Sequence, residues 1–175
     1  MSERIRLADL DEHTKGAVAD TRRRVAALHA ELPRWGLVVW TAGNVSERVI
    51  VDRGDGPIKT DLFVIKPSGV SYDELTADTM VVCTLDGEKI DDGTPASLTP
   101  SSDTAAHAYV YRHRDDVGGV VHTHSPYATA WAARREPIPC ALTMMGDEFG
   151  GDIPIGPFAL IGDDSIGRGI VETLE

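Results

Sequence analysis

Residues 117–125, with the sequence VGGVVHTHS, decide how the rest of the chain is interpreted. The apolar stretch from Val117 to Thr123 predicts a strand that ends at a pair of histidines. Side chains two residues apart in a strand point to the same side, so His122 and His124 are expected to converge. Two neutral imidazoles with an open position suit a divalent ion such as zinc. An isolated pair of this kind is as often two ordinary polar residues at a strand end, so this motif alone leaves the metal site open.

The segment PSSD at residues 100–103 precedes that strand and starts a helix predicted to end near His113. An isolated Asp103 in this context is best interpreted as a helix cap. However, helix starts also bind phosphate through free amides, and Ser101 and Ser102 would add two hydroxyl groups. This corner of the fold is therefore able to hold an anion and a third metal ligand, Asp103, together.

Two further loops have the composition of an anion site. Residues 43–46 read GNVS and place Asn44 beside a glycine, and residues 66–69 read KPSG and place Lys66 at a strand end. Each is an ordinary turn sequence when taken alone. Their combination gains weight because ligands bind at strand ends that face a common crevice in α/β folds.

Hydrophobic periodicity divides the chain into helices and strands in mixed order. The first helix is predicted over residues 12–32, with an apolar face made of Val18, Val25, Leu28 and Leu32. Strands are predicted at 37–40, 45–51, 62–65, 79–85 and 117–123, and further helices at 101–113, 126–134 and from 163 onward. Residues 1–10 are predicted to be a loose leader, 54–60 a polar loop, and the chain after Pro137 a series of short strand-like pieces. This order predicts a sheet flanked by helices.

The composition excludes several classes of function. The chain has 175 residues and a formal net charge of −11, without a Lys/Arg-rich block, so it is a poor candidate for binding nucleic acid or an anionic membrane. No apolar run approaches the roughly 20 residues of a membrane span. Cys83 and Cys140 lie far apart in apolar stretches and are expected to be reduced core residues, which favours a cytoplasmic protein.

The four motifs together resemble a known family. They occur, in order, at residues 43–46, 65–70, 100–104 and 122–125, as in the class II aldolase/adducin family. Within it the chain is most similar to the L-ribulose-5-phosphate 4-epimerases, from about residue 15 to the end. The resemblance implies an α/β fold, a three-layer α/β/α domain with a mostly antiparallel central sheet. It also implies a homotetramer with its sites between subunits, and a single domain over residues 1–175 that lacks the family's C-terminal part.

The resemblance also implies the roles of individual residues. His122 and His124 are expected to be zinc ligands, and Asp103 falls at the acidic position of the metal site, where the epimerases have aspartate and the aldolases glutamate. Asp147 matches the aspartate that transfers a proton across the subunit interface. A third histidine ligand and a catalytic tyrosine of the family would lie beyond Glu175. The substrate phosphate is expected to contact Asn44, Lys66, Ser68, Gly69, Ser101 and Ser102.

The implied activity is a metal-dependent epimerisation of a phosphorylated ketopentose by C–C cleavage and re-formation. Three alternatives stay open: an aldolase that cleaves a sugar phosphate such as L-fuculose 1-phosphate, a dehydratase of a phosphorylated thio-sugar, and a non-catalytic adducin-like binding module. A non-functional piece of a longer enzyme is a fourth. Of the remaining histidines, His107 is expected to be structural, because a lone histidine in a helix usually is.

Overall fold

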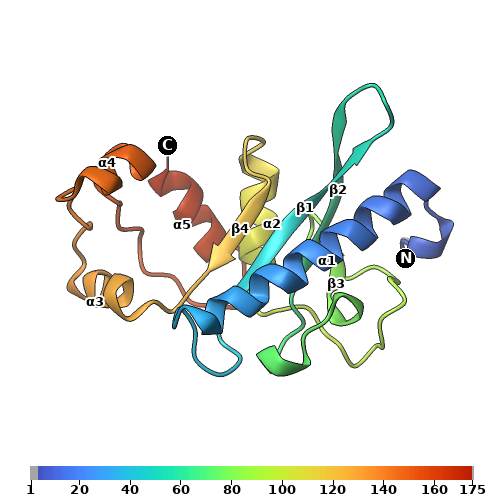
Figure 1. Ribbon diagram of the computed structural model, residues 1–175, viewed down its shortest axis with the longest axis horizontal. Helices are drawn as coiled ribbons and strands as arrows, with labels where there is room; N and C mark the ends of the chain where they lie inside the picture. The colour runs from blue at the N-terminus through green and yellow to red at the C-terminus, as the bar shows by residue number, and fades with distance from the viewer. Residues whose placement is uncertain (1–3, 175) are drawn as a thin grey trace.

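The computed structural model describes residues 4–174 and has helices on both faces of a four-stranded sheet (Figure 1). The sheet order is β3-β2-β1-β4, and every neighbouring pair is antiparallel. This arrangement confirms the predicted α/β fold with an antiparallel sheet. The strands are β1 (Asn44–Asp52), β2 (Pro57–Ile65), β3 (Val81–Thr84) and β4 (Gly119–His122).

Helix α1 (Glu12–Arg34) covers one face of the sheet and packs mainly on β1. The side chain of Asp11 caps its first turn by accepting hydrogen bonds from the backbone amides of His13 and Thr14. The prediction that Leu28 faces the core is wrong, since this side chain is 48% exposed. The buried stripe of α1 instead includes polar residues, and its members are Thr14, Val18, Thr21, Val25, His29 and Leu32.

Helix α2 (Thr104–His113) covers the opposite face, and α5 (Ser165–Thr173) packs on α2. Alternation along β2 separates the two cores, because Val64 contacts the cluster under α1 whereas Phe63 contacts Tyr111 of α2. The α2–α5 contact is close: a Cβ on Gly167 would lie 2.4 Å from the backbone oxygen of Ala106.

The segments outside the layers differ most from prediction. The expected strand at 37–40 is a loop, and 57–60 of the expected polar loop belongs to β2. Residues 4–10 are not a loose leader, since the backbone of residues 5–7 bonds to Asp91; residues 1–3 lie outside the described range. After Pro137 the chain forms α4 (Thr143–Phe149), and only isolated bridges, Ile138 with Ile153 and Ile161 with Asp163, stand among the described residues where strand-like pieces were expected.

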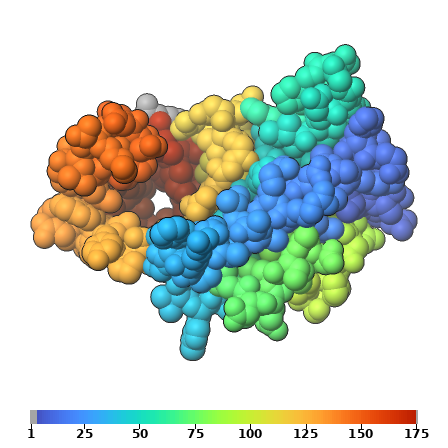
Figure 2. Space-filling view, in the orientation of Figure 1, coloured from blue at the N-terminus to red at the C-terminus, as the bar shows by residue number. Residues whose placement is uncertain are grey.

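The predicted helix at 126–134 is confirmed as α3 (Pro126–Arg134). Together with α4 it lies at one end of the molecule, and Figure 2 shows a hollow among these C-terminal segments. The described residues also form three short 3-10 turns: η1 (Leu7–Asp9), η2 (Tyr72–Glu74) and η3 (Ala77–Thr79). No helix within residues 4–174 has both the length and the apolar character to cross a membrane.

Candidate metal and phosphate site

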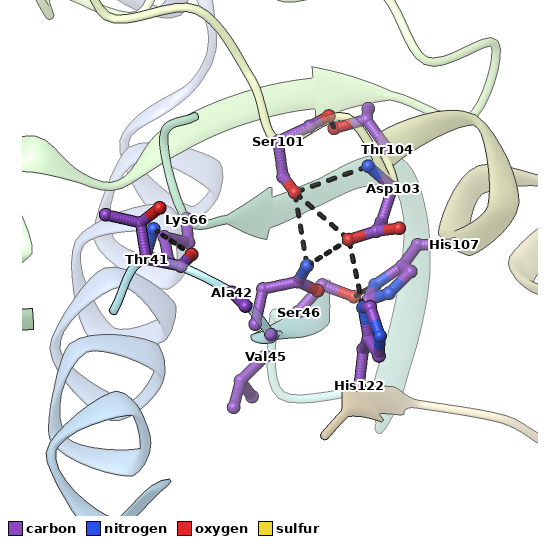
Figure 3. A network of polar contacts seen from close by, with 12 residues as sticks. Thr41, Ala42, Val45, Ser46, Lys66, Ser101, Asp103, Thr104, His107 and His122 are labelled. Carbon is purple, nitrogen blue, oxygen red and sulfur yellow. Dashed lines mark hydrogen bonds and ion pairs between the residues drawn. The ribbon is translucent and has the colours of Figure 1, made fainter. Parts of the chain in front are cut away.

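Three distant segments meet where β1 begins and β4 ends. Asn44, the first residue of β1, pairs directly with His122, the last residue of β4. Asp103 immediately precedes α2, which covers the same end of the sheet (Figure 3). The turn into β1 needs a glycine, because Gly43 has φ +76° and an added Cβ would lie 2.9 Å from the backbone oxygen of His122.

The carboxylate of Asp103 is the centre of this cluster. Its Oδ2 accepts hydrogen bonds from Asn44 Nδ2 at 2.6 Å, from His122 Nδ1 at 3.0 Å and from Ser101 Oγ at 3.5 Å. The side chain makes no helix-capping bond, so the capping interpretation of Asp103 is wrong. Burial alone would raise the pKa of Asp103, but the hydrogen bonds from His122 and Asn44 outweigh it and lower the pKa below its usual value. Asp103 is therefore a buried anion at neutral pH.

The two histidines of the sequence motif lie next to each other. The rings of His122 and His124 are 4.8 Å apart between centroids, with the planes tilted by 36°. The backbone amide of His124 donates to the carbonyl oxygen of Leu37 at 2.7 Å, which fixes the chain just after β4. Because Asp103 engages Nδ1 of His122, the Nε2 atom of that ring is left for a ligand.

The donor set fits a divalent metal, although no group of three His, Cys, Asp or Glu residues within 4–174 is already arranged as a metal site. Two adjacent imidazoles and one buried carboxylate are the ligand types that zinc prefers. The contact between Asp103 and His122 is that of a carboxylate that orients a metal-binding imidazole. The structure therefore gives Asp103 a second possible role beside that of direct ligand.

Asn44 uses its donors within the protein. The two hydrogens of Nδ2 go to Asp103 and to Ser101 Oγ, the latter at 3.1 Å, while Oδ1 is buried without a hydrogen-bond partner among the described residues. The carboxylate fixes this orientation, since a flipped amide would place Oδ1 against another negative oxygen. A phosphate contact through Nδ2, as the resemblance implies, requires exchange of the bond to Ser101.

Lys66 is a buried cation without a counter-ion among residues 4–174. It is 2% exposed, and its Nζ donates to the carbonyl oxygens of Thr41 at 3.2 Å and Pro67 at 3.3 Å. Its ammonium lies 5.4 Å from the ring centroid of Tyr72, and no carboxylate of residues 4–174 lies within ion-pair distance. Burial lowers the pKa of Lys66. An unpaired buried ammonium favours the arrival of an anion.

The loop that follows Lys66 lies against the start of α2. The amide of Ser68 donates to Thr99 O at 2.8 Å, and the amide of Ser101 donates to Lys66 O at 3.0 Å. The structure thus brings the 66–69 and 99–102 segments together, as an anion site requires. Ser68, Gly69 and Ser102 are exposed beside them.

Asp147 is not part of this cluster. It is exposed on α4, at the end of the molecule away from α1, and within residues 4–174 it makes no hydrogen bond or ion pair with the residues around Asp103 (Figure 1). Its expected role across a subunit interface stays a prediction.

His107 was expected to be structural and lies in the wall of the site. It is 3% exposed, one helical turn after Asp103, and its Nδ1 is 2.7 Å from Ser46 Oγ. Burial lowers the pKa of His107 to about 4, so the ring is neutral at pH 7. The spacing of four residues from Asp103 was the available signal, because such residues share one face of a helix.

A large cavity lies away from this cluster. Its volume is about 980 Å³ and it lies between α3, residues 153–159 and α5. Apolar groups such as Phe158, Ile166 and Ile170 line it, and none of the predicted site residues does. It does not contribute to the chemistry of the histidine cluster.

Comparison with known proteins gives a consistent result. Residues 23–175 match the family model described as "Class II Aldolase and Adducin N-terminal domain". The chain is 46% identical over 133 residues to the L-ribulose-5-phosphate 4-epimerase of Salmonella paratyphi C, which covers 76% of this chain and 53% of that protein. A protein of Mycoplasma pneumoniae named "Probable L-ribulose-5-phosphate 4-epimerase" is 44% identical over 137 residues, 78% of this chain and 52% of its own length. The chain thus spans about half the length of the curated relatives it matches.

Solved structures share the fold. An L-fuculose 1-phosphate aldolase superposes with a TM-score of 0.73 at 26% identity, over 89% of this chain and 67% of the aldolase. An L-fuculose 1-phosphate aldolase from Glaciozyma antarctica gives a TM-score of 0.70 at 18% identity, over 95% of this chain and 61% of that one. At that identity the second match supports the fold alone.

Proposed function

Because the chain belongs to the class II aldolase and adducin N-terminal domain family, we propose that it forms the metal- and phosphate-binding part of a sugar-phosphate epimerase. The proposed substrate is L-ribulose 5-phosphate or a closely related ketopentose phosphate. The proposed reaction inverts one carbon by breaking and re-forming the C–C bond beside it. The observation that supports this most strongly is the set of Asn44, Asp103 and His122 next to His124, in a chain 46% identical to a named epimerase.

In this proposal His122 and His124 hold one divalent ion, Zn²⁺ or another, with Asp103 as third ligand or as the group that orients His122. A bound divalent ion supplies Lewis-acid stabilisation of the negative charge that develops on the ketose oxygen during C–C cleavage. Asp103 keeps a proton on Nδ1 of His122, and the adjacent residue His124 is exposed to solvent. The support is the donor set and its proximity.

The phosphate pocket proposed here combines a buried cation with amides and hydroxyl groups. Lys66 has no carboxylate partner in residues 4–174, and the loop after it is bonded to the segment that leads into α2. Binding the phosphate would keep the cleaved fragment in place, so that the bond re-forms on its other face. The proposed contacts are Asn44, Lys66, Ser68, Gly69, Ser101 and Ser102.

Proton transfer is assigned in this proposal to Asp147 of a neighbouring subunit in a homotetramer. Its exposed position on α4 leaves the carboxylate accessible to a second chain. A carboxylate removes the hydroxyl proton whose loss starts the cleavage. Zinc as the metal, the tetramer and the cytoplasmic location are predictions from the sequence.

The second candidate is an aldolase. The structural match to an L-fuculose 1-phosphate aldolase, with a TM-score of 0.73, favours it, because the same site can release the fragment instead of rejoining it. Product analysis separates the two: an inverted pentulose phosphate indicates an epimerase, and two smaller fragments indicate an aldolase. An adducin-like binding module would yield neither product.

The first test is a calorimetric titration with Zn²⁺ of this chain and of a His122→Ala/His124→Ala double mutant. The proposal expects one tightly bound ion per chain and loss of that binding in the mutant. Equal, weak binding by both proteins would contradict a metal site formed by this chain.

A further inference from the structure

Strand β1 and helix α2 are joined by two layers of polar side chains. The site set consists of Asn44, Asp103 and His122, which are hydrogen-bonded as described above. The inner set consists of Ser46, His107 and Tyr111. Two residues of strand advance about 6.6 Å and four residues of helix about 6 Å, so the spacing of the two layers matches on both elements.

Ser46 holds the inner set together. Its Oγ lies 2.7 Å from His107 Nδ1 and 2.7 Å from Tyr111 Oη, and all three side chains are at most 3% exposed. Hydrogen bonds in such a buried setting are strong and leave little freedom of position. Tyr111 is fixed further by the ring of Phe63, whose centroid is 5.3 Å away.

The inner set lies directly behind the site set. Ser46 pairs with Val120 of β4 as Asn44 pairs with His122, so both layers span the same two strands. Figure 3 shows the ring of His107 beside His122 and Asp103. The carboxylate of Asp103 acts on the pKa of His107 in the direction opposite to burial, which agrees with the proximity of the two side chains. A change in the distance between β1 and α2 at Ser46 therefore displaces Asp103 relative to His122.

We propose that Ser46, His107 and Tyr111 act as positioning residues that hold Asp103 against His122 and thereby fix which nitrogen of His122 is free for a ligand. This inference deepens the proposed function and rests on it for the identity of the ligand. The contact with Asp103 places the proton of His122 on Nδ1 and leaves the lone pair on Nε2. Without the inner set, the Asp103 contact loosens and both tautomers become populated.

The test is the tautomer of His122 in the metal-free 175-residue chain, measured from the ¹⁵N and ¹³C shifts of the ring. The wild type is expected to show the Nδ1–H form, and Ser46→Ala a mixture of the two forms. The matched control is Thr60→Val, which removes a 2.8 Å bond to Val49 O, further along β1 from the site. This control is expected to keep the wild-type tautomer of His122 even if it lowers the melting temperature as much as Ser46→Ala does.

A second readout is Co²⁺ affinity, which is expected to fall about 10-fold in Ser46→Ala and to stay within about 2-fold in Thr60→Val, as for other groups that orient metal ligands. If Ser46→Ala does not fold, Tyr111→Phe takes its place, because it keeps the ring against Phe63 and removes one hydrogen bond. A folded variant with the wild-type tautomer overturns the positioning role. A wild type that binds no metal overturns the proposed function instead, and the tautomer measurement still decides this inference.

Discussion

Two regions of the molecule differ in how far their side chains are buried: the sheet region, residues 4–122, and the C-terminal region, residues 126–174. The first region buries apolar residues on both faces of its sheet and also buries charged or polar groups such as Lys66 and Asp103. In the second region, the described residues of α3 and α4 include no buried side chain. Its exposed apolar residues include Tyr127, Leu142, Met144, Phe149, Phe158 and Leu160.

The difference shows where each region obtains its stability. The sheet region forms its own core and can tolerate unpaired polar groups at the site, such as Asn44 Oδ1, which has no partner among the described residues. The C-terminal region leaves an apolar surface of a kind that is typical of contacts with other polypeptide. The C-terminal region contacts the sheet region closely through α5, which packs on α2 and has buried residues at Gly167 and Gly169.

The sharpest way to test this contrast is to make the same substitution in both regions. Phe63→Ala removes a side chain that is 0% exposed, whereas Phe158→Ala removes one that is 87% exposed. The first is expected to lower the free energy of unfolding by roughly 3–5 kcal/mol and the second by about 0.5 kcal/mol or less. Urea unfolding followed by circular dichroism measures both, and similar losses would show that the two regions share one core.

Acid should destabilise the sheet region through its buried histidines. Burial lowers the pKa of His29 and that of His107 to about 4, from an ordinary value of 6.5. The unfolded chain therefore binds these protons first, so the stability present above pH 6.5 is lost as the pH falls towards 4. The expected loss is roughly 3 kcal/mol for each histidine. Unfolding free energies between pH 7 and 4 test this, and a His29→Gln variant should show a shallower dependence.

Lys66→Met should separate stability from binding. The buried ammonium has no carboxylate partner in the described chain, so replacing it with an apolar side chain is expected to stabilise the protein by about 1 kcal/mol. The same change should abolish the rise in melting temperature that inorganic phosphate produces in the wild type. A variant that is less stable and still responds to phosphate would show that Lys66 serves structure alone.

The smallest effect is expected at the C-terminal end of α3. Arg135 has φ +58°, a left-handed conformation in which glycine is less strained. Arg135→Gly should stabilise α3 locally by less than about 1 kcal/mol and slow chymotryptic cleavage near Tyr127. The urea midpoint of the sheet region should stay unchanged; a shift of that midpoint would mean that the two regions unfold together.

The sequence predicted the sheet better than the buried face of the first helix. Strand β1 and helix α3 follow from apolar runs bounded by Gly43 and by Ser125-Pro126. On α1 the buried stripe includes Thr21 and His29, and a hydrophobicity pattern assigns such residues to solvent. His29 is accommodated because its Nδ1 is 2.7 Å from Val25 O and its Nε2 accepts from the amide of Val45 at 2.9 Å. A pattern based on polarity cannot foresee such pairings.

The other errors also have a tertiary cause. Residues 37–40 are apolar enough for a strand but find no sheet partner, and Trp40 is 92% exposed. Residues 57–60 are mostly exposed, yet residues 57–59 pair with β1 because the hairpin extends past the core. The motif order led to the expectation that Asn44, Asp103 and His122 lie close together, as they do, whereas the inner set around His107 depends on how α2 lies against β1. The orientation of α2 against β1 is set by tertiary packing, which a local sequence pattern does not predict.

The pairing of β1 with two different neighbours has a consequence for the order of folding. Its contact with β2 closes a short hairpin, whereas its contact with β4 joins Asn44 to His122 across more than seventy residues. Closing the longer loop costs more chain entropy and is slower. During synthesis, the hairpin can form well before His122 is made, so the ligand site is among the last features of the molecule to assemble. A chain that binds a ligand at this site has therefore already paired β4 with β1.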